Sequence, residues 1–430
     1  MPVSSGDIAH LLRRTGFGAP PALVAELSQL TLAEAVDRVL DVSANPADTI
    51  TWPFATDWEN WLYLRRWWMD RMATVPNPLQ EKLTFFWHGH FASSFAKVND
   101  LNIMYRQNQI LRRNAFGDFE TLAQEISLDP AMLLYLDNYD NYSSSPNENF
   151  ARELMELFML GVDQGYTQAD VVAMARAWTG HGIKWTDQGV QGYEFHPWAH
   201  DTGNKTLFGI TKNWDGPQTI TEMVRGSRSN ICAQFIARKL WSFFAGPTND
   251  ANLILALATD MLTSNWNIGA FLRRIFNRPE FYTDSVKNGL VRPPVDWAVT
   301  LLRATGVSAQ ELDIDYRMVD LGQGLFEPPN VSGWKQNQTW LTETVSWIKE
   351  DIASNIARVA TDRGFLNSIL ALTPANAVTA AMNTLYIDRV SPGTRQAVET
   401  WIAAERTAGG TRERYNIIRL LSLTPEFQLA

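Results

Sequence analysis

The sequence predicts an all-α fold with a small β insertion, because helical patterns dominate it and strand patterns are confined to one stretch. Amphipathic runs recur over most of the chain. Strand-like runs between Gly, Asp and Asn turn signals gather around residues 182–209. A composition of 45% hydrophobic and 19% charged residues over 430 positions is typical of a globular protein. We therefore expect a multi-helix body with a β-hairpin-like insertion.

Two helices are predicted early in the chain. The run from Asp57 to Val75 carries bulky side chains at helical spacing and is stopped by Pro76 and Pro78. The next helix is expected from about Asn77, as its cap, to Trp87. Further helices are predicted over residues 101–113, 119–126, 149–160, 168–178, 229–244, 251–262, 269–276, 294–305, 341–360, 395–404 and 412–421.

The predicted domain organisation is one helical domain over residues 1–430. Residues 182–213 form its β/loop insertion, which carries His196, His200 and Asp201. Neither this insertion nor residues 307–316 resembles a flexible, low-complexity linker. A single compact body is therefore expected.

Composition argues against several classes of protein. The formal net charge of -9, without a long basic run, argues against nucleic-acid binding. Cys232 is the only cysteine, which excludes cysteine-rich zinc modules. No apolar stretch approaches the roughly 18 residues of a membrane span. No signal peptide is visible from Met1, and both cytoplasmic and exported locations stay open. Motifs of serine hydrolases and phosphate-binding loops are also missing.

Five of the six histidines fall into two short stretches, which suggests a metal or acid–base site. His88 and His90 lie between aromatic residues, and the i,i+2 spacing lets both bind one ion if the segment is extended or ends a helix. His200 is the sharpest candidate of the second stretch. His88 and His90 are about as plausible as ordinary core histidines, satisfied by hydrogen bonds, as they are as metal ligands.

An acidic segment follows at residues 146–158. At helical spacing Asn149, Arg152, Glu153 and Glu156 share one face, opposite an apolar stripe. Two carboxylates one turn apart can hold a metal or divide acid and base work. The alternative is a solvated face on which Arg152 pairs with a glutamate at i,i+4.

The loop at residues 195–206 supplies further candidates. His200 and Asp201 can furnish metal ligands, or a base beside an orienting carboxylate, and Lys205 can stabilise negative charge. Residues 201–204 also read as an ordinary turn, which favours a structural role for Asp201.

Seventeen tryptophans suggest binding of sugar faces or other flat apolar ligands where the indoles are exposed. Trp87, Trp198 and Trp334 are the candidates, together with Asn149 as a polar contact. Most tryptophans are nevertheless expected in the core.

The chain resembles the bacterial family catalogued as domain of unknown function 1800, over essentially its whole length. The segments that carry the resemblance are residues 10–18, 81–91, 147–158, 175–180, 200–205, 292–294, 330–334 and 425–427. The family name assigns no function. The resemblance implies frequent export, and a neighbouring protein that resembles alkaline phosphatases as a partner.

We expect these motifs to converge. His88, His90 and His200, with Glu153, Glu156 or Asp201, would then hold a divalent Zn, Mn or Fe ion with an open position for water. The predicted activity is metal-dependent hydrolysis of a glycan or of a phosphate- or ester-containing extracellular substrate, in which the metal lowers the pKa of its water to about 7. Arg152 or Lys205 would stabilise the developing charge. Two alternatives stay open: a metal-free glycosidase or transferase with paired carboxylates, and a noncatalytic, Trp-rich glycan-binding or assembly protein.

Overall fold

A computed structural model describes residues 3–187, 189–287, 289–335 and 337–430. It is mainly helical, with two small antiparallel sheets of two strands each among the described residues, as the sequence predicts. None of the described helices combines the length and apolar character that crossing a membrane requires.

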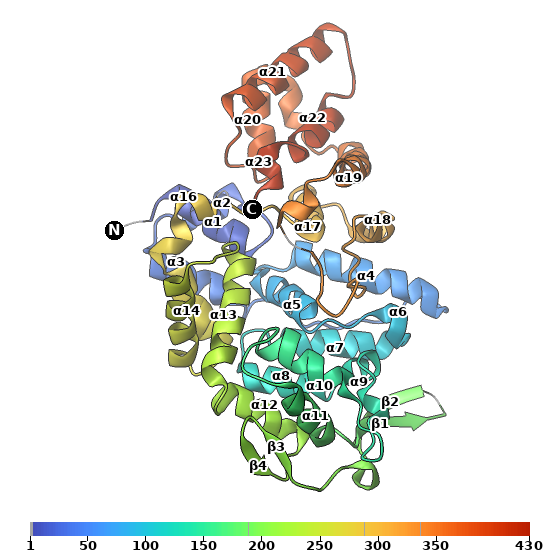
Figure 1. The fold of residues 1–430 in the computed structure, drawn as a ribbon. Helices are drawn as coiled ribbons and strands as arrows, with labels where there is room; N and C mark the ends of the chain where they lie inside the picture. Colours follow the sequence, from blue (N-terminus) through green and yellow to red (C-terminus); the bar gives the residue numbers. More distant parts are fainter. Residues whose placement is uncertain (1–2, 188, 288, 336) are drawn as a thin grey trace.

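In the N-terminal third of the chain, helix α5 lies near the middle of the molecule and packs against α4 and α7 (Figure 1). The α-helices of this third are α1 (Ser5–Thr15), α2 (Pro21–Leu27), α3 (Leu32–Leu40), α4 (Asp57–Thr74), α5 (Leu79–His90), α6 (Phe95–Val98), α7 (Leu101–Arg113), α8 (Phe119–Ser127) and α9 (Pro130–Tyr135). Helix α4 begins after Thr56, whose side chain accepts from the Glu59 N–H, and so matches its predicted bounds closely. Helix α5 instead continues past Trp87 through His90.

The middle of the chain holds the β insertion, and the β1–β2 hairpin projects from the body (Figure 1). Its elements are η1 (Asn138–Asp140), α10 (Glu148–Glu153), the π-helix η2 (Leu154–Met159), α11 (Gln168–Ala177), β1 (His181–Thr186), β2 (Gly189–Phe195), η3 (Pro197–Ala199), β3 (Lys205–Leu207) and β4 (Ile210–Lys212). Strands β1 and β2 pair His181 with Phe195 and Ile183 with Tyr193, and the register shifts between Lys184 and Trp185.

The remaining chain is helical, and α20 to α23 gather at the end of the molecule farthest from the hairpin (Figure 1). These elements are α12 (Gly216–Arg225), α13 (Ser229–Phe244), α14 (Ala251–Thr263), α15 (Ile268–Phe276), η4 (Pro279–Tyr282), α16 (Asp284–Lys287), α17 (Pro294–Thr305), η5 (Ala309–Glu311), α18 (Ile314–Asp320), η6 (Asn337–Trp340), α19 (Glu343–Asp362), η7 (Asn367–Ala371), α20 (Pro374–Thr384), α21 (Pro392–Thr407), α22 (Glu413–Ser422) and α23 (Pro425–Gln428).

Two hydrophobic clusters form the core. One includes Leu83 of α5 and most buried residues of α8 to α15. The other includes Phe85 of α5, Trp68 of α4 and the buried faces of α17 to α22. Helix α5 therefore contributes to both clusters. Whether the chain is a single domain, as expected from its sequence, stays a prediction.

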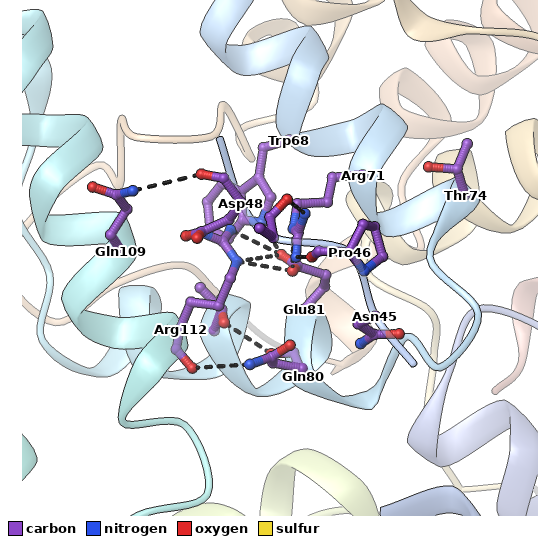
Figure 2. A network of polar contacts seen from close by, with 12 residues as sticks. Asn45, Pro46, Asp48, Trp68, Arg71, Thr74, Gln80, Glu81, Gln109 and Arg112 are labelled. Atoms are coloured by element: carbon purple, nitrogen blue, oxygen red, sulfur yellow. Dashed lines mark hydrogen bonds and ion pairs between the residues drawn. The ribbon is translucent and has the colours of Figure 1, made fainter. Parts of the chain in front are cut away.

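A buried polar network fixes α5 against α4 and α7 (Figure 2). The Glu81 carboxylate, fully buried, accepts hydrogen bonds from Arg71 Nε at 2.6 Å and Arg112 Nε at 2.8 Å. Trp68 Nε1 donates to its second oxygen at 2.9 Å. Such a carboxylate between two guanidiniums gives α5 a defined position, since each buried charge has its partner.

Candidate functional site

His88 and His90 do not share a site, which corrects the expectation that they bind one ion. Helix α5 runs through both residues, so i,i+2 spacing sends their side chains to opposite sides. His88 Nε2 accepts the Phe326 N–H at 3.1 Å, whereas His90 Nε2 donates to Phe158 O at 2.9 Å. Burial lowers the pKa of His88 to about 3 and that of His90 well below its ordinary value. Both are neutral core histidines, the alternative weighed from the sequence.

His200 lies in a third environment, in the β insertion. Its Nδ1–H donates to Thr179 O at 2.8 Å, and its ring packs edge-on against His181 and Phe195. In the described ranges no three His, Cys, Asp or Glu side chains form a group that could hold a metal ion. His88, His90 and His200 thus do not meet at one place, contrary to what the sequence predicted. Metal binding itself stays a prediction.

The acidic face at residues 148–156 forms ion pairs within its own helix. Arg152 bonds Glu148 at 3.0 Å and Glu156 at 3.2 Å, the i,i+4 alternative expected for a solvated face. Burial, and then Glu156, raise the pKa of Glu153. Asn149 Nδ2 donates to Leu136 O at 3.1 Å and so fixes a turn. The residues of this acidic face contact one another, and none of the contacts given above joins them to His88 or His90.

Asp201 and Lys205 hold the loop that carries His200. Asp201 Oδ2 accepts from Arg176 Nε at 2.7 Å, while Oδ1 accepts the Gly203 N–H of a turn. Lys205 is buried, and its ammonium donates to Asn213 Oδ1 and Trp214 O, each at 2.9 Å. With its donors engaged by these acceptors, Lys205 has a structural role in this conformation.

Sequence reasoning missed the partners of His181. The His181 ring bridges Tyr193 Oη at 2.9 Å and Asp215 Oδ1 at 3.0 Å, which ties the hairpin to the N-terminus of α12. Burial, and then Asp215, raise the pKa of Tyr193 to about 12. His181 belonged to the second histidine stretch, but nothing in the spacing pointed to Asp215.

The three candidate tryptophans occupy different environments. Trp87 is fully buried and donates to Ala115 O, so it belongs to the core. Trp198 is 75% exposed and stacks on Tyr142. Trp334 is nearly buried, stacks on Phe85 and lines a cavity.

This cavity lies between the two hydrophobic clusters and has a volume of about 280 Å³. Helices α1, α5, α13 and α17 and the chain around Trp334 form its wall. Its aromatic lining consists of Phe17, Phe85, Phe86, Phe243, Trp334 and Trp340. A cavity of this size, apolar with a few polar groups, is typical of a small-molecule site.

Glycines let the wall close around α5. Gly333 has a φ of +80°, and a Cβ there would lie 2.1 Å from Gly89 O, so only glycine allows this approach. The close approach places the Trp334 indole against Gly89 and Phe85.

The cavity carries an excess of positive charge. Among the described residues that line it, the cations are Arg14, Lys82, Arg238, Lys239 and Lys335, and the one acid is Asp296. Lys82 already pairs with Asp296 at 2.7 Å and donates to Arg13 O and Gly16 O. No lining carboxylate is left for the other four cations.

Two arginines at the cavity are buried without a full set of partners. Arg14 is 1% exposed; one guanidinium nitrogen donates to Val286 O, but Nε and Nη1 have no hydrogen-bond partner in the described structure. Burial, and then neighbouring Arg13, lower the pKa of Arg14 to about 9. Arg292, next to the lining residue Pro293, is also buried, and its Nη1 is unpartnered too. Asp296 is the one acid among the described lining residues, so positive charge is in excess here, an arrangement that favours binding of an anion.

Four of the segments that carry the family resemblance meet at this cavity. They contribute Arg14, Lys82, Pro293 and Trp334, among other lining residues. Except for Trp334, sequence reasoning named none of these as a site. The basic residues of those segments were a possible sign of an anion site, but no spacing rule relates positions that lie so far apart in the sequence.

The sequence model of a family described as "Protein of unknown function (DUF1800)" matches residues 10–429. Neither a curated protein nor a solved structure matches the chain significantly.

Proposed function

The chain belongs to the DUF1800 family, and we propose that it binds a small organic anion, a carboxylate attached to an apolar group, in the central cavity. The observation that carries this proposal is an excess of buried positive charge, because Asp296 is the one acid among the described lining residues and it already pairs with Lys82. Asp296 also raises the pKa of Arg14 and Arg292, but burial lowers both by more, and each keeps an N–H group without a hydrogen-bond partner among the described residues. An anion would compensate the remaining positive charge.

The shape and lining of the cavity favour a carboxylate with an apolar body. Guanidinium groups recognise carboxylates through paired, charge-assisted hydrogen bonds. The aromatic rings of Phe86, Phe243 and Trp334 offer flat apolar contacts to the rest of the ligand. A volume of about 280 Å³ suits a ligand of about one ring in size.

Calorimetric titration with three probes of one shape tests the proposal. Benzoate is expected to bind, benzyl alcohol to bind more weakly and benzylamine not at all. Arg238→Gln, an exposed lining position, should weaken benzoate binding about fivefold, as expected for one partly solvated charge. Arg273→Gln is the control, since Arg273 pairs with Asp37 elsewhere on the surface. Benzylamine binding as tight as benzoate binding, or no benzoate binding, would overturn the proposal.

Hydrolysis, expected from the sequence, is a second proposal, and His200 favours it. Because its Nδ1–H donates to Thr179 O, its Nε2 carries the lone pair that a general base or metal ligand needs. Assays of native protein against phosphate and carboxylate esters, with metal analysis, test it. His200→Gln should abolish any turnover found, whereas His196→Gln should retain it. Equal turnover in both variants contradicts a role for His200.

A further inference from the structure

Lys239 differs from the other lysines of the cavity in how weakly it is held. Its ammonium has one hydrogen bond, to Leu157 O at 3.4 Å, and none of the described carboxylates forms an ion pair with it. Lys82 in the same cavity has three acceptors, and Lys335 is exposed. Lys239 is therefore a cavity amine that can leave its present position at small cost.

Burial and a neighbouring cation favour the neutral form of Lys239. Its Nζ lies 5.0 Å from the Phe235 ring centroid, a contact that favours the ammonium, but the side chain is held in apolar surroundings and Arg238 precedes it in α13. Burial, and then Arg238, lower the pKa of Lys239 to about 8. A lysine in apolar surroundings beside another cation is the arrangement that activates an amine as a nucleophile.

His90 is a neutral neighbour of Lys239 that offers an acceptor nitrogen. Lys239 and His90 bond to consecutive carbonyls of the π-helix η2, Leu157 O and Phe158 O, and both pack on Phe235. Because His90 Nε2 donates its hydrogen to Phe158 O, its Nδ1 is an acceptor, and this atom has no partner among the described residues. Single π-helical turns of this kind are frequent at functional sites.

We infer that Lys239 forms an imine with the carbonyl group of a small 2-oxo acid whose carboxylate is held by the cavity cations. The inference rests on the proposed function and narrows its ligand class. The neutral amine adds to the carbonyl carbon, and one of its two protons passes to the carbonyl oxygen to give a carbinolamine. The second N–H proton then passes to the hydroxyl group, which leaves as water when the C=N bond forms, and neutral His90 Nδ1 accepts a hydrogen bond from the nitrogen during this transfer.

Reductive trapping of the full chain tests this inference. Pyruvate with borohydride should add one reduced pyruvate to Lys239, located by peptide mass spectrometry, whereas lactate, which has the same charge but no carbonyl, should add nothing. The trapping rate should rise through pH 8, since about half of a group with this pKa is neutral there. Lys239→Arg should lose the adduct, whereas Lys184→Arg, at an exposed position of β1 outside the cavity, should keep it.

Two results would overturn the inference. One is the absence of an adduct, and the other is an adduct spread over exposed lysines. If benzoate still binds in either case, the proposed anion site is retained and only imine formation at Lys239 is contradicted. If benzoate does not bind the wild-type chain, the proposed function fails as well.

Discussion

Glu81 is a carboxylate on which three helices depend. Burial raises the pKa of its carboxyl, but Arg112 and Arg71 lower it by more, so that the group stays ionised in the core. Removing this charge would leave Arg71 without its ion-pair partner and Arg112 with Asp48 alone. Replacing one partner of a buried ion pair is costly for this reason, even where the intact pair adds little.

Glu81→Gln is therefore expected to lower the free energy of unfolding by about 3–5 kcal/mol. Urea denaturation at pH 7 measures it. Glu26→Gln is the matched control, because Glu26 is exposed on α2, and its effect should stay within about 0.5 kcal/mol. Since the folded pKa of Glu81 is lowered, its contribution is present at neutral pH and is lost as the pH falls through that folded value. A loss below about 1 kcal/mol would show that the network is not needed for stability.

His88 should make stability depend on pH in the mildly acidic range. Its pKa falls from 6.5 to about 3 on folding, so the unfolded chain binds a proton that the folded chain rejects. The stabilisation is complete above pH 6.5 and declines as the pH falls from there toward 3. Between pH 6.5 and 5 one such group costs about 2 kcal/mol.

Replacing His88 by Leu is expected to reduce the stability difference between pH 7 and pH 5 by about that amount, about 2 kcal/mol. Urea unfolding of both proteins at the two pH values measures it. The variant is less stable at pH 7, because the Phe326 N–H loses its acceptor, so the comparison concerns the difference and not the absolute stability. An unchanged difference would mean that His88 titrates normally in the folded protein.

At the scale of elements, sequence patterns predicted many of the longer helices but missed others, including α1, α12 and α20, and they predicted helix ends less well. Helix α5 was expected to stop at about Trp87, but it continues through His90. Gly89 lies inside the helix, where the Gly333 turn packs directly on it. Because His88 and His90 are both helical, their side chains diverge, and the local pattern did not show this. The π-helix η2 was likewise read as part of a regular helix.

The β1–β2 hairpin is expected to depend on one histidine. A two-stranded hairpin is marginally stable alone, and His181 links it through Tyr193 and Asp215 to α12. His181→Ala should raise hydrogen exchange in β1 and β2 by about tenfold and leave α5 unchanged, measured by mass spectrometry. Lys184→Ala, at an exposed position of β1, is the control. Unchanged exchange in the hairpin would contradict the role of this link.

At the scale of the whole molecule, the candidate site is formed by the packing of distant segments rather than by a local sequence motif. Arg14, Lys82, Lys239 and Arg292 come from four distant parts of the chain and meet only because α1, α5, α13 and the start of α17 pack together. The histidine stretches, in contrast, were proposed as a site because their residues lie close together in the sequence. Clustering in sequence was a poor guide to the predicted metal site, since it could not state which way each side chain points.

Because the cavity lies between the two hydrophobic clusters, a bound anion should stabilise both sides together. At a benzoate concentration about 100 times its Kd, the free energy of unfolding should rise by about 2.7 kcal/mol. Hydrogen exchange should slow in α13, which belongs to one cluster, and around Trp334, which belongs to the other, but not in the β1–β2 hairpin. Slowing on one side alone would place the ligand on that surface. Slowing on both sides is the expected result, because a ligand bound between the two clusters stabilises only the folded arrangement in which they pack together.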